Sequence, residues 1–140
     1  MLVIWLNLLK KMYKIGDSWD YSWKIDKSIY SKFLSLSGDH NPMHTSDVFA
    51  KSNGFREKIV HGNILNCFIS YFIGEIIPTK NVIIIEQKIS FVKPFFINDI
   101  INLNSVVEKF VESVNFVEFN FNFYKGETMI SKGYIHIKIL

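Results

Sequence analysis

The sequence predicts a single α+β domain in which one long helix packs against an antiparallel sheet. Residues 61–77 are apolar on nearly every side of a helix, which is typical of a buried element. Four later segments have a period of two, and an earlier extended segment can complete a sheet with them. One buried helix followed by a series of strands favours an α+β layer arrangement. At 140 residues, with 49% apolar and 21% charged residues, the chain has the size and composition of one compact domain.

The first half of the chain is expected to form one strand and two helices. Residues 16–24 alternate loosely and predict a strand or extended entry. Asp26 is a candidate N-cap for a helix that continues to Leu36. Its buried side is expected to consist of Ile29, Phe33, Leu34 and Leu36. A short helix is expected over residues 46–52, before the Asn53-Gly54 turn.

The second half is expected to form the central helix and four strands. Pro78 ends the helix over residues 61–77, whose small and polar residues recur three, four and four positions apart: Asn63, Asn66, Ser70 and Gly74. This strip suits either close packing against the sheet or the lining of a substrate channel. Cys67, in the same helix, is expected to be a packed core thiol. Strands are expected over residues 81–92, 100–109, 114–124 and 128–140.

Composition and charge exclude several classes of protein. The net charge of +3 comes from lysines that form no basic stripe, so we expect no nucleic-acid partner. One cysteine allows no internal disulfide and fits a reducing cytoplasm. The apolar run in residues 1–11 is about half the length that crosses a bilayer, so we expect an N-terminal extension and no membrane anchor. No Cys/His or multi-carboxylate cluster has ligand spacing, so no metal site is expected.

The most informative stretch is residues 33–44, which reads FLSLSGDHNPMH. Gly38 and Pro42 both break regular structure, and Asn41 is pushed toward extended geometry because a proline follows it. Asp39 and His44 are therefore expected on one ordered loop that points both side chains at a common spot. A carboxylate and an imidazole that share a water molecule are the minimum equipment for adding or removing water by general acid–base chemistry.

The same residues also fit a plain helix exit. Gly38 would then be a C-terminal cap, Asp39 a turn residue and His44 an incidental surface imidazole. Asn41 is expected to tie the loop together, and a simple turn-forming role explains it equally well. His61 is expected to be structural, and His40 is given no role.

The whole string decides between these alternatives, since it resembles the signature of the MaoC-like, (R)-specific enoyl-CoA hydratase and 3-hydroxyacyl dehydratase family. That signature continues to a small residue, here Ala50. Residues 59–65 resemble the family's apolar-apolar-His-Gly opening of the central helix, and residues 89–99 resemble its Phe-x-x-Pro turn. Asn98 stands where the family usually has Gly, and Asn tolerates the left-handed backbone that such a turn requires. The resemblance covers roughly residues 12–140.

The resemblance implies a single hotdog domain over residues 12–140, in which a curved antiparallel sheet wraps around the central helix. It implies a homodimer or a dimer of dimers, and a hydro-lyase that reversibly hydrates a trans-2-enoyl thioester to a (R)-3-hydroxyacyl thioester. Asp39 and His44 would hold the water, and the backbone N–H of Gly62, at the positive end of the helix, would stabilise the thioester oxygen. Asn41, Asn63 and Ser70 are the expected substrate contacts; Asn63 stands where an apolar residue is common in the family.

The substrate would be an acyl-CoA or an acyl carrier protein, so coenzyme A or phosphopantetheine would arrive as part of it and no separate cofactor is expected. Two other functions fit a hotdog domain. A thioesterase would need a separately placed carboxylate and does not explain the loop with Asp39 and His44. A non-catalytic acyl-thioester-binding module is the second alternative, because a fold does not by itself imply a function.

Overall fold

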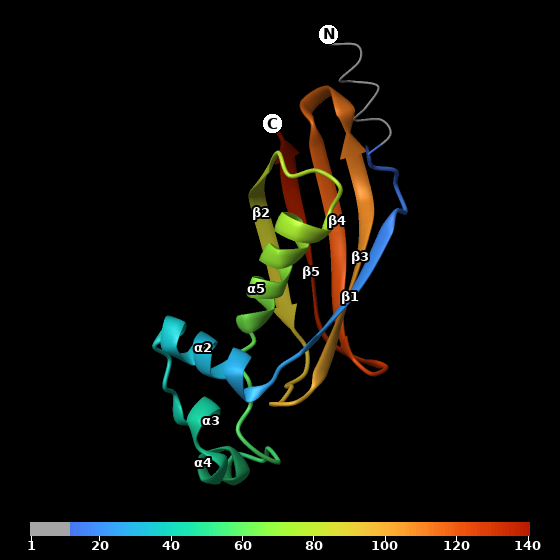
Figure 1. Cartoon of the computed structure of the whole chain (residues 1–140). Helices are drawn as coiled ribbons and strands as arrows, with labels where there is room; N and C mark the ends of the chain where they lie inside the picture. The colour runs from blue at the N-terminus through green and yellow to red at the C-terminus, as the bar shows by residue number, and fades with distance from the viewer. Residues whose placement is uncertain (1–11) are drawn as a thin grey trace.

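The structure is a computed structural model that describes residues 12–140. In this part of the chain, five strands form one antiparallel sheet, and a helix packs along one of its faces (Figure 1). Three further helices gather beyond one end of the sheet, near the start of the packed helix. The α+β prediction, one helix against an antiparallel sheet, is confirmed.

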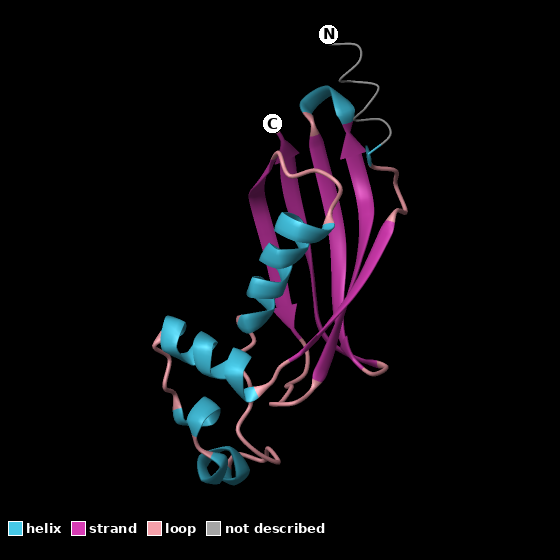
Figure 2. Ribbon diagram, in the orientation of Figure 1, coloured by secondary structure: helices cyan, strands magenta, loops and turns pink. Residues whose placement is uncertain are grey.

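The strand order in the sheet is β1-β3-β4-β5-β2, so β1 and β2 are the edges of the described sheet. The strands are β1 (Ser18–Lys24), β2 (Val82–Phe91), β3 (Ile100–Val111), β4 (Phe116–Lys125) and β5 (Thr128–Ile139). Each lies within about two residues of its predicted range. Figure 2 shows that the strands are long and twisted, and that the larger helices lie on one side of them.

The helices are α2 (Lys27–Ser37), α3 (Pro42–Thr45), α4 (Asp47–Ser52) and α5 (Ile64–Tyr71). A π-helical turn, η1 (Phe72–Ile76), extends α5, and a 3-10 turn, η2 (Glu112–Val114), connects β3 to β4. The central helix was expected from residue 61 but begins at Ile64. The reason is a tight turn before it, in which the carbonyls of His61 and Gly62 accept N–H groups three residues ahead.

Two expectations about burial were wrong. Leu36 is 81% exposed, and the buried residue of α2 is Tyr30. This follows from the position of α2 beyond the end of the sheet, where only part of its surface is covered (Figure 1). Cys67 is exposed and not a core thiol, because the sheet covers only one side of α5.

The core lies between α5 and the inner face of the sheet. The helix α5 and its π-helical extension η1 contribute six buried apolar residues: Ile64, Leu65, Phe68, Ile69, Phe72 and Ile73. The sheet contributes Leu103, Phe119, Phe121 and Ile135, among others. Each such side chain contributes roughly 1.5–3 kcal/mol when it is fully buried, so this contact fixes the position of α5 on the sheet. The residues that precede α5 are fixed with it.

Gly133 on β5 is a point of unusually close approach between two strands. A Cβ atom at this position would lie 1.9 Å from the Lys88 carbonyl oxygen of β2 and 2.7 Å from the Phe121 ring. Even a methyl group therefore does not fit. The absence of a side chain at Gly133 lets β2 and β5 lie in their observed register, in which Gly133 faces Ile89.

Two local features of the turns were predicted correctly. Asn98 has φ +73°, the left-handed backbone that the Phe-x-x-Pro turn was expected to keep. Asn41 has ψ 133°, the extended geometry expected before a proline. Residues 1–11, where an extension was expected, lie outside the described residues. In residues 12–140, no helix is both long and apolar enough to span a bilayer.

Candidate active site

The loop that carries Asp39 is built from a helix end and two short turns. Gly38, with φ +64°, caps α2 in the left-handed conformation and donates its N–H to the Leu34 carbonyl. The Asp39 Oδ1 atom then accepts the backbone N–H of Asn41 at 3.0 Å. The helix exit is therefore real, and it leaves the Asp39 side chain half-exposed at the end of α2.

The short helix α3 places His44. The Asn41 side chain accepts the Met43 N–H at 2.9 Å and so caps α3, while Pro42 occupies its first turn. The His44 ring is then held by a 2.8 Å hydrogen bond between its Nδ1 and the Ile59 carbonyl oxygen. The Tyr30 hydroxyl donates to the His44 carbonyl, which ties α2 to α3.

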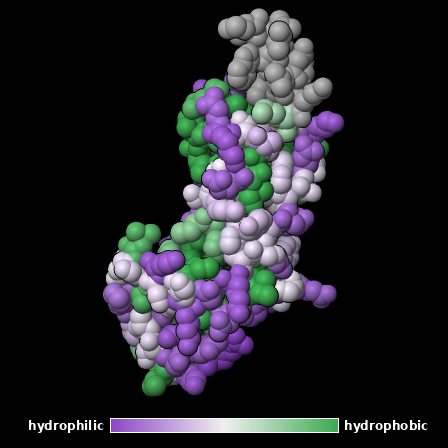
Figure 3. Space-filling view, viewed as in Figure 1, coloured by the Kyte–Doolittle hydropathy of each residue, from purple (hydrophilic) through white to green (hydrophobic). Residues whose placement is uncertain are grey.

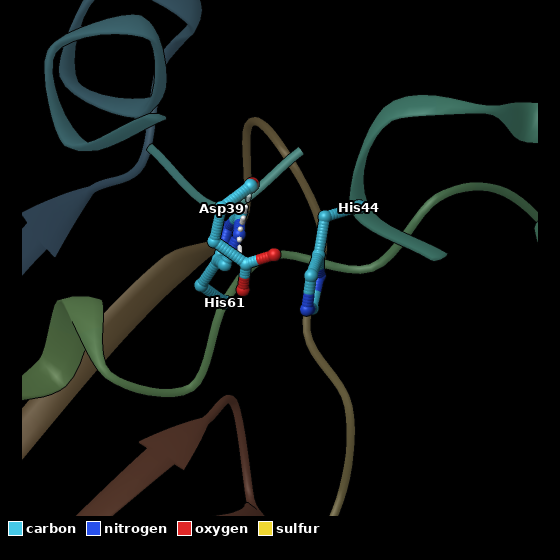
Figure 4. Close-up of side chains that lie close together, drawn as sticks. All are labelled: Asp39, His44 and His61. Atoms are coloured by element: carbon cyan, nitrogen blue, oxygen red, sulfur yellow. Dashed lines mark hydrogen bonds and ion pairs between the residues drawn. The ribbon is translucent and has the colours of Figure 1, made fainter. Parts of the chain in front are cut away.

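His61 is the third member of the cluster, although it was expected to be structural. It is 5% exposed, and its Nε2 lies 3.0 Å from the Asp39 carbonyl oxygen and 3.3 Å from the Asp39 carboxylate. Its ring stacks on that of His44, with 3.7 Å between centroids and 24° between planes. Figure 4 shows the three side chains side by side, with His61 against Asp39. One polar atom each of Asp39, His44 and His61 lies within 4.8 Å of the others.

The hydrogen bonds decide which ring nitrogens carry protons. A carbonyl oxygen can only accept, so Nδ1 of His44 is protonated and the Nε2 of the neutral ring is left as a proton acceptor. By the same reasoning Nε2 of His61 is protonated. Its Nδ1 is buried without a hydrogen-bond partner in the described part of the chain. His44 therefore has a nitrogen available for proton transfer.

The environment separates the charge states of Asp39 and His61. The Asn41 N–H holds the pKa of the Asp39 carboxyl below its usual range, and the nearby histidines act in the same direction. Burial lowers the pKa of His61, and the charge of a protonated His44 lowers it further. At neutral pH the cluster thus contains an ionised carboxylate and a neutral His61. Burial raises the pKa of Tyr30, so its hydroxyl stays a donor to His44.

A pocket of about 340 Å³ opens beside His44. Gly62 and Asn63 form part of its wall, and the rest is mostly apolar: Phe55, Ile59, Val60, Phe91, Val92, Lys93, Pro94 and Phe95. A Cβ atom on Gly62 would lie 2.7 Å from the Phe91 ring, so this glycine also makes room for that ring. Among the residues that line this pocket, neither Asn41 nor Ser70 is found. An apolar pocket with a few polar groups at one end is typical of a small-molecule site.

Sequence spacing did not reveal that Asp39, His44 and His61 offer three possible metal ligands. Their present contacts favour proton transfer over coordination. Nδ1 of His44 binds a carbonyl and Nε2 of His61 faces Asp39. Lone pairs of ring nitrogens lie in the ring planes, and the two rings stack nearly parallel, so those lone pairs do not converge on one point.

Comparison with known proteins identifies the family. The model of the MaoC like domain matches residues 14–123. The chain belongs to the MaoC-like domain family. The (R)-specific enoyl-CoA hydratase of Rhodospirillum rubrum is 31% identical over 106 residues, which span 76% of this chain and 74% of that protein. The (R)-specific enoyl-CoA hydratase of Aeromonas caviae is 33% identical over 86 residues, 61% of this chain and 64% of that protein.

The solved structures agree with this assignment. The structure of an (R)-hydratase from A. caviae involved in PHA biosynthesis has a TM-score of 0.84 and 26% identity to this MaoC-like domain. The match covers 91% of this chain and 98% of that one. The expected hotdog fold is therefore confirmed: an antiparallel sheet around a central helix in a single domain.

Within this MaoC-like domain, the structure brings together four of the six predicted site residues and separates Asn41 and Ser70 from them. Asp39 and His44 lie in one cluster, and His44 and Gly62 border one pocket with Asn63. The oxygen of the Asn41 side chain is already used to cap α3. Ser70 lies exposed on α5, two turns after Gly62. Their contacts with substrate stay predictions.

Proposed function

We propose that this MaoC-like domain catalyses the reversible (R)-specific hydration of a trans-2-enoyl thioester to a (R)-3-hydroxyacyl thioester. The observation that carries the proposal is the convergence of an ionised Asp39 and the free Nε2 of His44 beside the pocket that Gly62 borders. The names of the related enzymes support the same reaction. A carboxylate next to an imidazole that borders an apolar pocket suits the activation of one water molecule.

The proposed reaction uses one water held between Asp39 and His44. The water oxygen forms the new bond to C3 while its proton passes to one member of the pair. The π electrons of the alkene move toward the thioester carbonyl, whose oxygen becomes negatively charged. A proton from the pair is then delivered to C2 as these electrons return. His61 is neutral, and its Nε2 lies 3.0 Å from the Asp39 backbone carbonyl oxygen and 3.3 Å from the carboxylate, so it positions Asp39 and does not itself exchange a proton.

Gly62 is the proposed donor to the developing negative charge on the thioester oxygen. Its N–H donates to no protein acceptor within residues 12–140, and the residue borders the pocket two positions before α5. The partial positive charge at a helix N-terminus favours an anion at this place. Asn63 and Ser70 are the proposed contacts to the acyl part of the substrate, while Asn41 holds the loop.

The test of this function measures hydration of the double bond and cleavage of the thioester on the same substrates. Purified protein is mixed with a trans-2-enoyl-CoA and, separately, with the same acyl group on acyl carrier protein. We expect loss of the conjugated enoyl absorbance, an (R) product on chiral analysis, and no release of free thiol. Thiol release would favour a thioesterase. Saturable binding without either reaction would favour a non-catalytic acyl-binding module.

We further propose that the protein is a homodimer, or a dimer of dimers, joined at β2. This edge strand exposes three consecutive isoleucines, Ile83, Ile84 and Ile85, each by 44–52%. Apolar surface gathers over the part of the molecule that contains the sheet and α5, while the part formed by α2–α4 is mostly polar (Figure 3). An exposed apolar edge strand is a template for pairing with another chain.

Light scattering at micromolar concentration is expected to give twice the mass of one chain or more. Ile84→Lys should shift the protein toward the monomer, because a charge at this edge opposes pairing. Val114→Lys is the matched control: Val114 is 57% exposed but lies in the turn between β3 and β4. A wild-type monomer at these concentrations would contradict the proposed assembly.

We also propose the extent of the catalytic domain, the metabolic context of the reaction and the location of the protein. Residues 12–140 form the catalytic domain, with residues 1–11 as an extension of it. The reaction belongs to acyl-thioester metabolism such as fatty-acid metabolism. A cytoplasmic location rests on the single cysteine, since one thiol cannot form an internal disulfide.

A further inference from the structure

Three side-chain amides form a hydrogen-bonded chain from the edge of the sheet to the wall of the pocket. Nε2 of Gln87, on β2, donates to Oδ1 of Asn66 at 2.6 Å. Nδ2 of Asn66, on α5, donates to Oδ1 of Asn63 at 3.2 Å. Asn63 borders the pocket together with His44 and Gly62. The proposed reaction assigns Asn63 a contact with the acyl part of the substrate but assigns no role to Asn66 or Gln87.

Asn63 is not explained as a helix cap. It occupies the N-cap position of α5, where an asparagine usually accepts a backbone N–H through its side chain. Its backbone is helical instead, with φ −63° and ψ −13°, and its side chain makes no cap hydrogen bond. The Asn63 side chain is therefore not used to cap α5.

The chain of amides leaves a hydrogen-bond donor at the pocket. Asn66 uses its oxygen toward Gln87 and its nitrogen toward Asn63, so the Asn63 oxygen is the atom that is occupied. The Asn63 amide nitrogen then has both protons available for another acceptor. Ser70 lies four residues after Asn66 and so adds a hydroxyl to the same side of α5.

We propose that Asn63, oriented by Asn66 and Gln87, selects enoyl thioesters whose acyl chain carries an oxygen beyond C3, such as an alkoxy, oxo or hydroxyl group. This inference deepens the proposed hydratase function and rests on it. An unsubstituted alkyl chain would displace water from the Asn63 amide without replacing its hydrogen bonds. A chain with an acceptor oxygen would replace them, and a site with a donor discriminates strongly against a ligand that lacks the partner.

The experiment uses substrate pairs that differ by one methylene replaced by oxygen. One pair is trans-hex-2-enoyl-CoA and trans-4-methoxybut-2-enoyl-CoA, and the other is trans-hept-2-enoyl-CoA and trans-5-methoxypent-2-enoyl-CoA. The wild type is expected to hydrate the ether of at least one pair with a kcat/KM about tenfold or more above that of the alkyl substrate. The uncatalysed hydration rate of each substrate is measured as well, and the ratio of the kcat/KM values is divided by the ratio of these rates to correct for intrinsic reactivity.

Three variants test whether Asn63 and its hydrogen-bonded neighbours cause the preference for the ether substrate. Asn63→Leu should reverse it in favour of the alkyl substrate. Gln87→Leu leaves Asn63 in place but removes its support, so it should lower kcat/KM for the ether more than for the alkyl substrate and so reduce the preference. Asn104→Leu is the matched control, because its amide bonds to Asp20 on the opposite face of the sheet. This control should keep the wild-type preference.

Each result that would contradict the inference about Asn63 has a different meaning for the proposed hydratase function. If the wild type hydrates both members of each pair equally, the hydratase function stands and the inference about Asn63 is wrong. If Asn63→Leu raises KM equally for every thioester, Asn63 contacts the shared carrier arm and does not read the acyl chain. If light scattering shows that Asn63→Leu is less associated than the wild type, the amides serve the subunit interface. An inactive wild type overturns the hydratase function itself and, with it, this inference.

Discussion

Asp39→Asn is expected to lose most of the hydration activity, on the order of 10²–10⁴-fold, while the protein still folds and binds acyl thioester. The substitution keeps the size of the side chain and an oxygen that can accept the Asn41 N–H. What it removes is an ionised base, since that N–H holds the pKa of the Asp39 carboxyl below its usual range. His44→Asn should cost a similar factor because it removes the free Nε2. Initial rates with an enoyl-CoA measure both effects.

The double variant distinguishes a shared water from two independent roles. If Asp39 and His44 act on one water molecule, the double variant should be little worse than either single variant. His40→Asn is the matched control, because His40 lies between them on the same exposed loop and is expected to stay within about twofold of the wild type. An Asp39→Asn protein that keeps a tenth or more of the wild-type rate would show that the proposed mechanism is wrong.

Gly62→Val is expected to lower kcat by roughly 10²–10³-fold, the usual effect of removing one donor from an oxyanion site. Gly62→Ala should show a smaller loss in the same direction. The physical cause is crowding at the N–H that is proposed to receive the thioester oxygen. Thermal unfolding should change little, because Phe91, the side chain that a new Cβ would meet, is 52% exposed and can turn away.

Phe91 also supplies the control for this prediction. A Cβ on Gly62 would lie 2.7–3.1 Å from three atoms of the Phe91 ring, so a loss of activity could come from a displaced ring alone. Phe91→Ala removes that contact. We expect Gly62→Val combined with Phe91→Ala to stay as impaired as Gly62→Val. A return to the activity of Phe91→Ala would place the oxyanion donor elsewhere.

The sheet was largely predictable from the sequence, because its signal is local. Alternation in segments such as residues 119–123 follows from one buried and one solvated face, and turns are marked by residues such as Gly126. The helices were predicted less well. The apolar residues of α2 gave no warning that Leu36 would be exposed, since burial there depends on how far the sheet extends. The prediction for Cys67 was wrong because an apolar sequence around α5 does not show which side of the helix the sheet covers.

The candidate site divides in a similar way. Asp39 and His44 are five residues apart, so the turn residues between them were enough to predict that they converge. His61 is 22 residues from Asp39, and its position depends on how α5 sits on the sheet. The motif that includes His61 was visible, but its contact with the Asp39 carboxylate was not. The amide chain through Gln87 likewise requires the register of β2, which no local pattern specifies.

The close approach at Gly133 has a consequence for attempts to redesign substrate range. Residues at the end of β2 border the pocket, so a library that aims to widen it would naturally target Phe91 and Val92. Such a library starts from a strand whose backbone touches Gly133 at Lys88, a few residues away. Repacking at the pocket therefore cannot be absorbed by sliding β2 toward β5. Useful variants should come from side-chain exchange at the pocket, and random mutagenesis should return Gly133 unchanged.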